Sequence, residues 1–350
     1  MDPLRLAIAG AGLIGRAHLQ HVQASDEAVL VALADPSPGA AELARGAGVP
    51  LFTDLAPLLD EAQPDGVILA TPNALHVAQA LACIERGVPV LVEKPVADTL
   101  VEAQRLVDAA ERSGVPVLVG HHRRHSAILE TAREVVTSGR LGRLVAVTGS
   151  ATFCKPDRYF DHGPWRKEAG GGPILINMVH EVDNLRTLLC DSAGEIVEVQ
   201  AMASSSTRGF AVEDTVAIGL RFAGGALGSF MLSDCAASAC SWELTSGENR
   251  SYDHHPDEDC YLIAGDRGSL AVPTMRLREY LGERSWWAPL HGERLPLQER
   301  DPLTAQLAHF CAVVRGEAAP RASVRDAART LAVTLAIAEA ARRARPVAIH

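Results

Sequence analysis

The stretch that decides the fold is Leu6-Ala7-Ile8-Ala9-Gly10-Ala11-Gly12-Leu13-Ile14-Gly15, an apolar run that leads into a glycine-rich turn. The run predicts a buried strand, and the apolar spacing of Ile14–Ala24 predicts a helix after the turn. In such a unit the first glycine permits a tight turn, the second lets the backbone approach a pyrophosphate, and the third lets helix and strand pack closely. The start of the helix also favours an anion. We therefore expect a dinucleotide to contact Gly10, Gly12, Leu13, Ile14 and Gly15.

The first 121 residues repeat this alternation of apolar strands and helices. The predicted strands are Leu6–Gly10, Val29–Ala34, Gly66–Ala70, Val90–Glu93 and Val117–Gly120, and the predicted helices are Ile14–Ala24, Gly39–Ala47, Ala74–Arg86 and Thr99–Ser113. Alternation of this kind is typical of an α/β domain, a Rossmann doubly wound parallel sheet with helices on both faces. We expect residues 1–121 to form this nucleotide-binding domain.

One acidic residue bears on the choice of dinucleotide. Asp35 follows the second predicted strand, twenty residues after Gly15. A carboxylate at this position can accept both ribose hydroxyls and would repel a 2′-phosphate. No arginine follows directly, since the next residues are Pro36-Ser37-Pro38. The sequence therefore favours NAD over NADP, although Asp35 could also be an ordinary turn residue.

The pattern changes after residue 121 to helices mixed with consecutive strands. The predicted helices are Ala127–Ser138, Pro173–Cys190, Thr304–Arg315 and Val324–Arg343, and the predicted strands are Arg143–Phe153, Val197–Ser204, Asp214–Phe222, Ala226–Leu232, Trp242–Ser246, Tyr261–Ala264 and Ser269–Val272. Short turns such as Ala223-Gly224-Gly225 indicate antiparallel neighbours. We expect residues 122–350 to form an α+β domain with a large, mostly antiparallel sheet, for substrate binding and oligomerisation.

Composition narrows the class of protein. The 350 residues carry a net charge of −10, with 47% hydrophobic and 22% charged residues, as in globular proteins of two domains. The acidic balance makes nucleic acid or an anionic membrane a poor partner. No apolar run is long enough to span a bilayer and no secretory signal is evident, so we expect a cytoplasmic protein. The seven cysteines and thirteen histidines show no paired ligand spacing, so we expect no metal.

Three further motifs give the chain a resemblance to a known family. They are Ala70-Thr71-Pro72-Asn73 with His76, then Glu93-Lys94-Pro95, then Gly170-Gly171-Gly172 leading to His180 and Asp183. Together with Val119-Gly120-His121-His122-Arg123-Arg124, their order and spacing resemble the Gfo/Idh/MocA family, named after glucose–fructose oxidoreductase, inositol dehydrogenase and a rhizopine-catabolism protein. The resemblance spans nearly the whole chain and implies an oxidoreductase.

The resemblance implies a role for several residues at the carboxyl ends of predicted strands. Ligands of an open parallel sheet sit at these ends. The implied cofactor contacts are Thr71, Pro72, Asn73, His76, Glu93, Lys94, His122, Trp165 and Arg166. Asn73 could instead serve only as a helix N-cap. Lys94 is catalytic in the family, and the bond before Pro95 is often cis; a lysine half withdrawn from water can orient a substrate oxygen and move a proton.

A second candidate for proton transfer lies on the helix after the triple glycine. His180 belongs to a polar stripe on an otherwise apolar helix, since Asn177, His180, Asn184 and Thr187 recur at steps of three or four. An imidazole is suited to accept the proton of an alcohol as hydride leaves the adjacent carbon. The position in the family also makes His180 the acid–base residue.

One departure from the family pattern concerns this helix. Many members carry an aspartate four residues before the histidine, where this chain has Ile176. Asn177 can hydrogen-bond but cannot ionise, and Asp183 could supply a carboxylate or be a helix-surface charge. The usual Lys–Asp–His proton relay is therefore in doubt. The candidate substrate contacts are Lys94, Tyr159, Asn177, His180 and Asp183, and the polar segment Lys155–Lys167 could equally be a surface loop.

These observations lead to one principal hypothesis and several alternatives. The chain is expected to be an NAD-dependent oxidoreductase that transfers hydride between nicotinamide and a secondary alcohol or carbonyl of a sugar, cyclitol or polyol. Cyclic cis-dihydrodiols are alternative substrates, and reduction of an aldehyde or imine is possible with the same groups. A non-catalytic NAD-sensing regulator on the same fold is the other alternative. We expect a homodimer or homotetramer.

Overall fold

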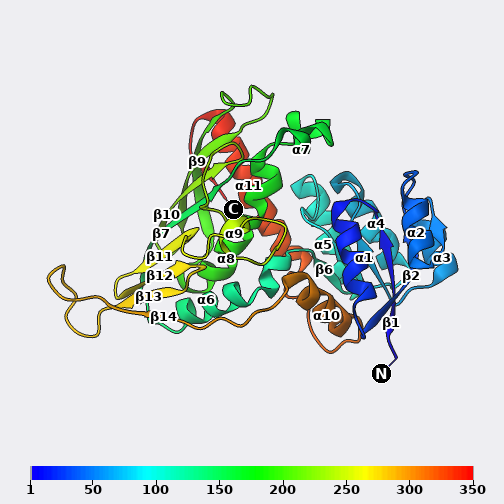
Figure 1. Cartoon of the computed structure of the whole chain (residues 1–350), viewed down its shortest axis with the longest axis horizontal. Helices are drawn as coiled ribbons and strands as arrows, with labels where there is room; N and C mark the ends of the chain where they lie inside the picture. The colour runs from blue at the N-terminus through cyan, green and yellow to red at the C-terminus, as the bar shows by residue number, and fades with distance from the viewer. Residues whose placement is uncertain (1, 350) are drawn as a thin grey trace. The chain divides into compact units, whose positions relative to one another are not determined.

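The computed structural model describes residues 2–349, which divide into two compact units (Figure 1). The first unit is built from the segment that ends at His125 and the segment Asp301–Leu331. The second unit contains Ser126–Arg300 and the segment that begins at Ala332.

The first unit is a Rossmann fold around a six-stranded parallel sheet. Its strands are β1 (Leu4–Ala9), β2 (Ala28–Ala34), β3 (Leu51–Phe52), β4 (Gly66–Leu69), β5 (Val90–Val92) and β6 (Val117–Val119). Their order is β3-β2-β1-β4-β5-β6, so the direction of winding reverses between β1 and β4. In such a sheet the crevice at the reversal, outside the carboxyl ends, is where ligands bind. The fold class expected from the strand–helix alternation is confirmed.

Helices connect these strands and cover the sheet. They are α1 (Leu13–Gln23), α2 (Ala40–Ala47), α3 (Leu55–Ala62), α4 (Asn73–Glu85) and α5 (Leu100–Ser113). Local signals explain their ends: the Thr99 hydroxyl accepts a hydrogen bond from Glu102 N at 3.2 Å, and Gly114 ends α5 with a left-handed φ of +71°. The short elements β3 and α3 were not predicted, because two strand residues and an eight-residue helix carry too little periodicity.

A late segment of the chain also belongs to the first unit. The helix α10 (Pro302–Val314) packs on α1 and on the 3₁₀ helix η1 (His122–His125). The sequence suggested a division at residue 121 with everything later in the second domain, and the contacts of α10 differ from that expectation. The cause is long-range packing. Phe310 is fully buried, and its ring packs so close to Gly66 of β4 that a Cβ on this glycine would lie 3.1 Å from the ring.

The second unit is built around a nine-stranded sheet in the order β14-β13-β12-β11-β7-β10-β9-β8-β15. Its strands are β7 (Leu144–Thr152), β8 (Ile196–Ser204), β9 (Thr215–Phe222), β10 (Leu227–Ser233), β11 (Tyr261–Gly265), β12 (Gly268–Val272), β13 (Arg276–Glu279), β14 (His291–Arg294) and β15 (Val347–Ala348). Only β7 and β10 pair in parallel among these neighbours. The mostly antiparallel sheet expected from the sequence is confirmed.

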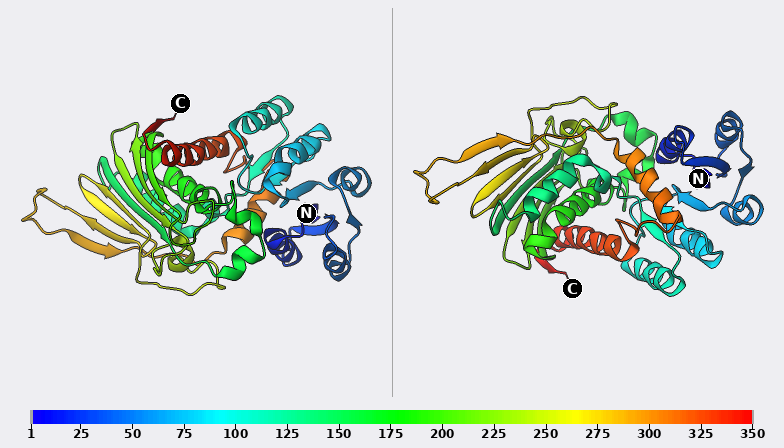
Figure 2. Two further views of the ribbon diagram at one scale, coloured as in Figure 1. Left: turned by 90° about the horizontal axis from the view of Figure 1, so that it is seen from above. Right: turned by 90° about the horizontal axis from the view of Figure 1, so that it is seen from below.

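Helices of the second unit lie on one face of this sheet, as Figure 2 shows. They include α6 (Ala127–Thr137) and α8 (Val179–Ala193), and α8 follows a π-helical turn, η3 (Ile174–Met178). A further helix, α11 (Val324–Arg343), contains residues of both units. Strand residues facing α6 and α8, such as Val147, Ile218 and Phe230, are buried. On the opposite face Val145, Met202, Met231 and Leu262 are exposed, the alternation of a sheet covered on one side.

The structure corrects several local expectations in this unit. Trp242–Ser246 is not a strand: Trp242–Thr245 is the helix α9, because the Ser241 hydroxyl accepts from Leu244 N at 3.3 Å and caps a turn. The segment Lys155–Glu168 contains two short helices, α7 (Asp157–Asp161) and η2 (Pro164–Lys167). The strands β13, β14 and β15 were not predicted, since their residues lack a clear apolar alternation.

Candidate functional site

The glycine turn after β1 has the geometry that a dinucleotide needs. Gly10 has φ of +101°, and a Cβ there would lie 2.3 Å from Ala70 O. A Cβ on Gly15 would lie 2.0 Å from Gly10 O, whereas a Cβ on Gly12 would meet nothing within 4 Å. Packing therefore requires glycine at positions 10 and 15, whereas the space next to Gly12, at the start of α1, is open. This arrangement fits a pyrophosphate against the backbone of Gly12.

Asp35 is tied directly to this turn. Its carboxylate accepts hydrogen bonds from Ala11 N at 2.6 Å and from Ser37 N at 2.7 Å. Partial burial raises its pKa, but the hydrogen bonds from Ser37 and Ala11 outweigh burial and hold the pKa below its usual value. Asp35 is therefore a carboxylate at neutral pH, at the end of β2 beside the strand that carries the glycine turn.

The Glu93-Lys94-Pro95 motif follows β5 and is anchored by a buried hydrogen bond between Glu93 and His18. Glu93 is 4% exposed, and its Oε1 lies 2.8 Å from His18 Nε2 on α1. Its Oε2 accepts from Lys94 N at 3.2 Å. Burial raises the pKa of Glu93, but the His18 hydrogen bond, its charge and that of Lys94 together lower it. Glu93 thus links the Lys94 backbone to the first helix, and its contact with a cofactor stays a prediction. Its partner His18 was not predicted from the sequence.

The Lys94–Pro95 bond is cis, as the family resemblance implied. Pro95 O and Thr71 O lie 2.8 Å and 2.9 Å from the two ring nitrogens of His76, whose side chain is fully buried. His76 was expected to contact the cofactor. The buried ring joins the turns after β4 and β5, and its contact with the cofactor stays a prediction.

The turn after β4 also differs in one detail from the expectation. Asn73 is the first residue of α4 and is exposed, while Pro72 holds the N-cap position, with no side-chain cap. The capping role considered for Asn73 is therefore wrong, and its amide is available to a ligand. Thr71 donates from its hydroxyl to Gln79 Oε1 at 2.6 Å, which fixes Thr71 beside this amide.

His122 lies at the start of η1, after β6. Burial, followed by the charge of Arg123, lowers the pKa of His122 to about 3, although Glu93 opposes this shift. The imidazole is therefore neutral across the physiological range. Thus Gly10, Asp35, Thr71, Lys94 and His122 follow five different strands and share the carboxyl edge of one sheet.

In the second unit, the helix that carries His180 begins with a π turn. The sequence predicted one continuous helix over Pro173–Cys190, but Ile174–Met178 is π-helical and α8 runs from Val179 to Ala193. Glu213 stabilises the start of this turn by accepting from Ile174 N at 2.9 Å. A Cβ on Gly172 would lie 2.3 Å from Glu213 Oε1, so this glycine admits the carboxylate. Single π turns within helices occur frequently at functional sites.

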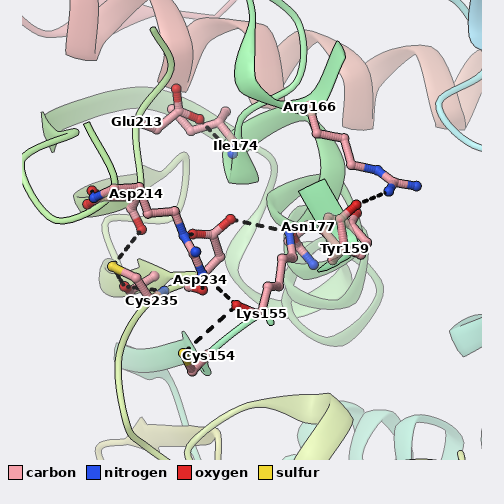
Figure 3. Close-up of polar contacts among 12 residues, drawn as sticks. Cys154, Lys155, Tyr159, Arg166, Ile174, Asn177, Glu213, Asp214, Asp234 and Cys235 are labelled. Atoms are coloured by element: carbon pink, nitrogen blue, oxygen red, sulfur yellow. Dashed lines mark hydrogen bonds and ion pairs between the residues drawn. The ribbon is translucent and has the colours of Figure 1, made fainter. Parts of the chain in front are cut away.

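The residues of the expected polar stripe separate into two groups. Asn184 is fully buried and donates to Tyr261 OH at 2.9 Å, so it faces the sheet. Asp183 is 1% exposed, which excludes the interpretation as a helix-surface charge. His180 is half-buried, and Asn177 accepts a hydrogen bond from Lys155 Nζ at 2.6 Å (Figure 3). Lys155 is a residue that the sequence did not single out as a site residue.

The segment between β7 and the triple glycine is ordered by stacking. The guanidinium of Arg166 lies 3.9 Å from the ring centre of Tyr159 and donates to Tyr159 O. It also lies 5.4 Å from the ring of Trp165, which is 52% exposed. A Cβ on Gly171 would lie 2.4 Å from Trp165 O, so the glycine run packs directly under this pair. Trp165 therefore presents an exposed ring on a fixed support.

Across residues 2–349, no group of three or more His, Cys, Asp or Glu side chains gathers as a metal site would. Within the same residues, no helix is long and apolar enough to cross a membrane.

A phosphate-binding glycine turn at a winding reversal, with a separate sheet domain, defines the class of two-domain dinucleotide-binding oxidoreductases. Two family models match the chain: "Oxidoreductase family, NAD-binding Rossmann fold" over residues 4–121, and "GFO/IDH/MocA C-terminal domain" over residues 129–271. The chain belongs to the Gfo/Idh/MocA family of oxidoreductases, as the motifs indicated.

Individual relatives agree with this assignment. The chain is 32% identical over 289 residues to 1,5-anhydro-D-fructose reductase of Ensifer adhaerens, covering 83% of this chain and 81% of the relative. It is 28% identical over 284 residues to inositol 2-dehydrogenase of Rubrobacter xylanophilus, covering 78% and 72%. The crystal structure of the WlbA dehydrogenase from Bordetella pertussis, in complex with NADH and UDP-GlcNAcA, matches with a TM-score of 0.78 and 25% identity over 99% of both chains.

Proposed function

We propose that this oxidoreductase uses NAD to interconvert a secondary alcohol and a carbonyl on a sugar, cyclitol or polyol. The observation that carries the proposal is the anchored Lys94. Its backbone is bound to the buried Glu93–His18 pair, at the same sheet edge as the open Gly12. The relatives that act on 1,5-anhydro-D-fructose and on inositol support a polyhydroxylated substrate.

The chemistry divides between the two units. NAD, when bound, would supply the acceptor for a hydride from the alcohol carbon. We assign Lys94 to orient the reacting oxygen through its ammonium, and His180 to remove the hydroxyl proton as the carbonyl forms. In the reverse direction His180 returns that proton. The neutral ring of His122 and the amide of Asn73 are assigned to the cofactor, together with Trp165 and Arg166 from the second unit.

The preference for NAD over NADP rests on Asp35. Its pKa is lowered, so a negative charge stands at the end of β2, next to Ala11 of the glycine turn. A carboxylate accepts the two ribose hydroxyls of NAD and repels the phosphate of NADP.

The test compares the wild-type protein with the variants Lys94→Met and His180→Gln. Turnover is screened with NAD against myo-inositol and a cis-dihydrodiol, and with NADH against 1,5-anhydro-D-fructose. We expect kcat to fall in both variants by about 100-fold or more, the contribution of a positioned acid–base group, with unchanged Kd for NADH. Full retained turnover in Lys94→Met would refute its role.

A regulator without catalysis is the second candidate, favoured by Ile176 where many relatives have an acid. It predicts NADH binding in calorimetry with no turnover of any alcohol or carbonyl.

We also propose a homodimer or homotetramer that covers the sheet face exposing Met202, Met231 and Leu262, because exposed apolar patches mark association surfaces. Sedimentation velocity that shows only a monomer would contradict this assembly.

A further inference from the structure

A buried lysine lies at the edge of the second unit's sheet where the parallel pair β7 and β10 ends. The last paired residues are Thr152 and Ser233, and Lys155 and Asp234 follow them. Lys155 N donates to Asp234 O at 2.8 Å, which aligns the two segments. Because carboxyl ends of parallel strands share one edge, these two side chains, far apart in sequence, lie together.

The ammonium of Lys155 has a defined set of neighbours, drawn in Figure 3. Nζ donates to Asn177 Oδ1 at 2.6 Å and lies 3.5 Å from Asp234 Oδ2, while its side chain is only 10% exposed. The ring centre of Tyr159 lies 4.9 Å from Nζ. An ammonium carries three N–H donors, and the two oxygens account for two of them. The third remains for an oxygen of a bound molecule.

The charges around Lys155 are already balanced. Asp234 Oδ1 is bound by Arg208 Nε at 2.8 Å, and Asp214 accepts at 2.9 Å from both Thr207 N and Arg208 N. Asp214 is thus held by backbone amides, whereas Lys155 and Arg208 both face the buried Asp234. The charge of Glu243 also acts on Lys155, so two cations are offset by two carboxylates. An added carboxylate would upset this balance, whereas a neutral hydroxyl can accept a hydrogen bond without changing it.

The lysine is bound to the helical segment that carries the imidazole assigned to proton transfer. Its partner Asn177 precedes His180 by three residues and lies in the π turn that leads into α8. The side chain of Ile176, the residue before Asn177, has no polar atom. Lys155 reaches this segment from the loop that follows β7, and its ammonium is bound to the residue three positions before His180.

We propose that Lys155 is a substrate-binding residue that donates a hydrogen bond from Nζ to a neutral hydroxyl beside the reacting carbon. Asn177 and Asp234 hold the ammonium in place, and the site selects substrates with vicinal hydroxyls over substrates that lack the second hydroxyl. The proposal rests on the proposed function for the identity of the reacting carbon, while the binding of a polyol at Lys155 can be measured independently.

The first experiment compares Lys155→Met with Lys155→Arg and with the matched control Lys167→Met. Lys167 is also a lysine of this segment, but its side chain is 35% exposed and pairs with Asp161 at 3.2 Å. For myo-inositol or 1,5-anhydro-D-fructose, we expect KM to rise about 10- to 100-fold in Lys155→Met, as for loss of a hydrogen bond to a charged group. We expect a smaller change in kcat, partial rescue in Lys155→Arg, and no change in Lys167→Met.

Two further readouts separate a binding role from a structural one. With a substrate analogue that lacks the neighbouring hydroxyl, the wild type and Lys155→Met should have equal KM. Burial lowers the pKa of Lys155 to about 8. The charges of Asp234 and Glu243 act to raise this pKa, and the charge of Arg208 acts to lower it further. The KM of the wild type should therefore rise above pH 8, and that of Lys155→Met should not. Equal KM of both proteins for the full substrate overturns the proposal.

Competitive acetylation of the wild-type chain covers the case in which the variant does not fold. Acetic anhydride is added to the protein with NADH, with and without myo-inositol or 1,5-anhydro-D-fructose, and each lysine is quantified by mass spectrometry. Protection of Lys155 but not of Lys167 supports the proposal. Protection without turnover of either compound supports the Lys155 site and contradicts the proposed function. Equal labelling of Lys155 with and without both compounds overturns the Lys155 site.

Discussion

Replacement of Gly12 by alanine should separate cofactor binding from folding. A Cβ at Gly12 meets nothing within 4 Å, and the residue has φ of −71°, which alanine adopts readily. We expect the free energy of unfolding to change by less than about 1 kcal/mol. The same methyl group would stand where a pyrophosphate approaches the backbone. We therefore expect the Kd for NADH to rise about tenfold or more, which corresponds to ~1.4 kcal/mol.

The matched variant Gly10→Ala should show the opposite separation. Its φ of +101° is unfavourable for alanine by about 1–2 kcal/mol. The added Cβ would also lie 2.3 Å from Ala70 O, and displacing backbone to relieve such overpacking costs about 1–3 kcal/mol. Together the two effects lower the free energy of unfolding by about 2–5 kcal/mol, so we expect the Tm of the first unit to fall by roughly 5–15 °C.

The assays are NADH fluorescence titration and calorimetric melting of the wild type and both variants. The expected result is weak binding with a normal Tm for Gly12→Ala, and a depressed Tm for Gly10→Ala. If Gly12→Ala binds NADH as the wild type does, the open space above Gly12 is not the pyrophosphate site. If it melts as early as Gly10→Ala, the distinction drawn from the glycine geometry is mistaken.

The remaining predictions concern two charged groups of the first unit. His18→Leu leaves the buried Glu93 carboxylate without its imidazole partner, so we expect a loss of about 3–5 kcal/mol in urea unfolding at pH 7.5. The pKa of Glu93, now lowered, should rise above its unfolded value in this variant. The buried Glu93 destabilises this variant only while it is ionised, so the destabilisation weakens as pH falls and Glu93 takes up a proton. The difference in the free energy of unfolding between His18→Leu and the wild type should therefore be smaller at pH 5 than at pH 7.5. A difference that does not depend on pH would contradict the stabilisation of the Glu93 carboxylate by His18. Asp35→Asn keeps an acceptor for Ala11 N but removes the charge, so NADP should bind about tenfold better relative to NAD. Titration with both dinucleotides measures this ratio, and an unchanged ratio would show that Asp35 does not set the preference.

Much of the first unit could be predicted from the sequence because its signals are local. The glycine turn, the cap at Thr99 and the apolar strands each depend on neighbours within one turn or strand. Motifs such as Glu93-Lys94-Pro95 follow the strands directly, so the topology of a parallel sheet brings them to one edge. The placement of Lys94 at that edge is therefore a consequence of sequence order.

Other features depended on tertiary structure. Periodicity indicated a strand at Trp242–Ser246, but the hydrogen bond of the Ser241 hydroxyl made it a helix. The position of α10 was determined by the burial of Phe310 against β4, a contact with a segment far away in the chain.

The sequence by itself determined the class of fold, the glycine turn and the positions of the motif residues, because these follow from periodicity and local turn chemistry. Only the tertiary structure paired His18 with Glu93, buried His76 beneath two turns, and brought Lys155 to Asn177 and Asp234. Each of these contacts joins residues on different elements. A buried polar group must find its partner wherever packing places one, and no spacing along the chain encodes that distance.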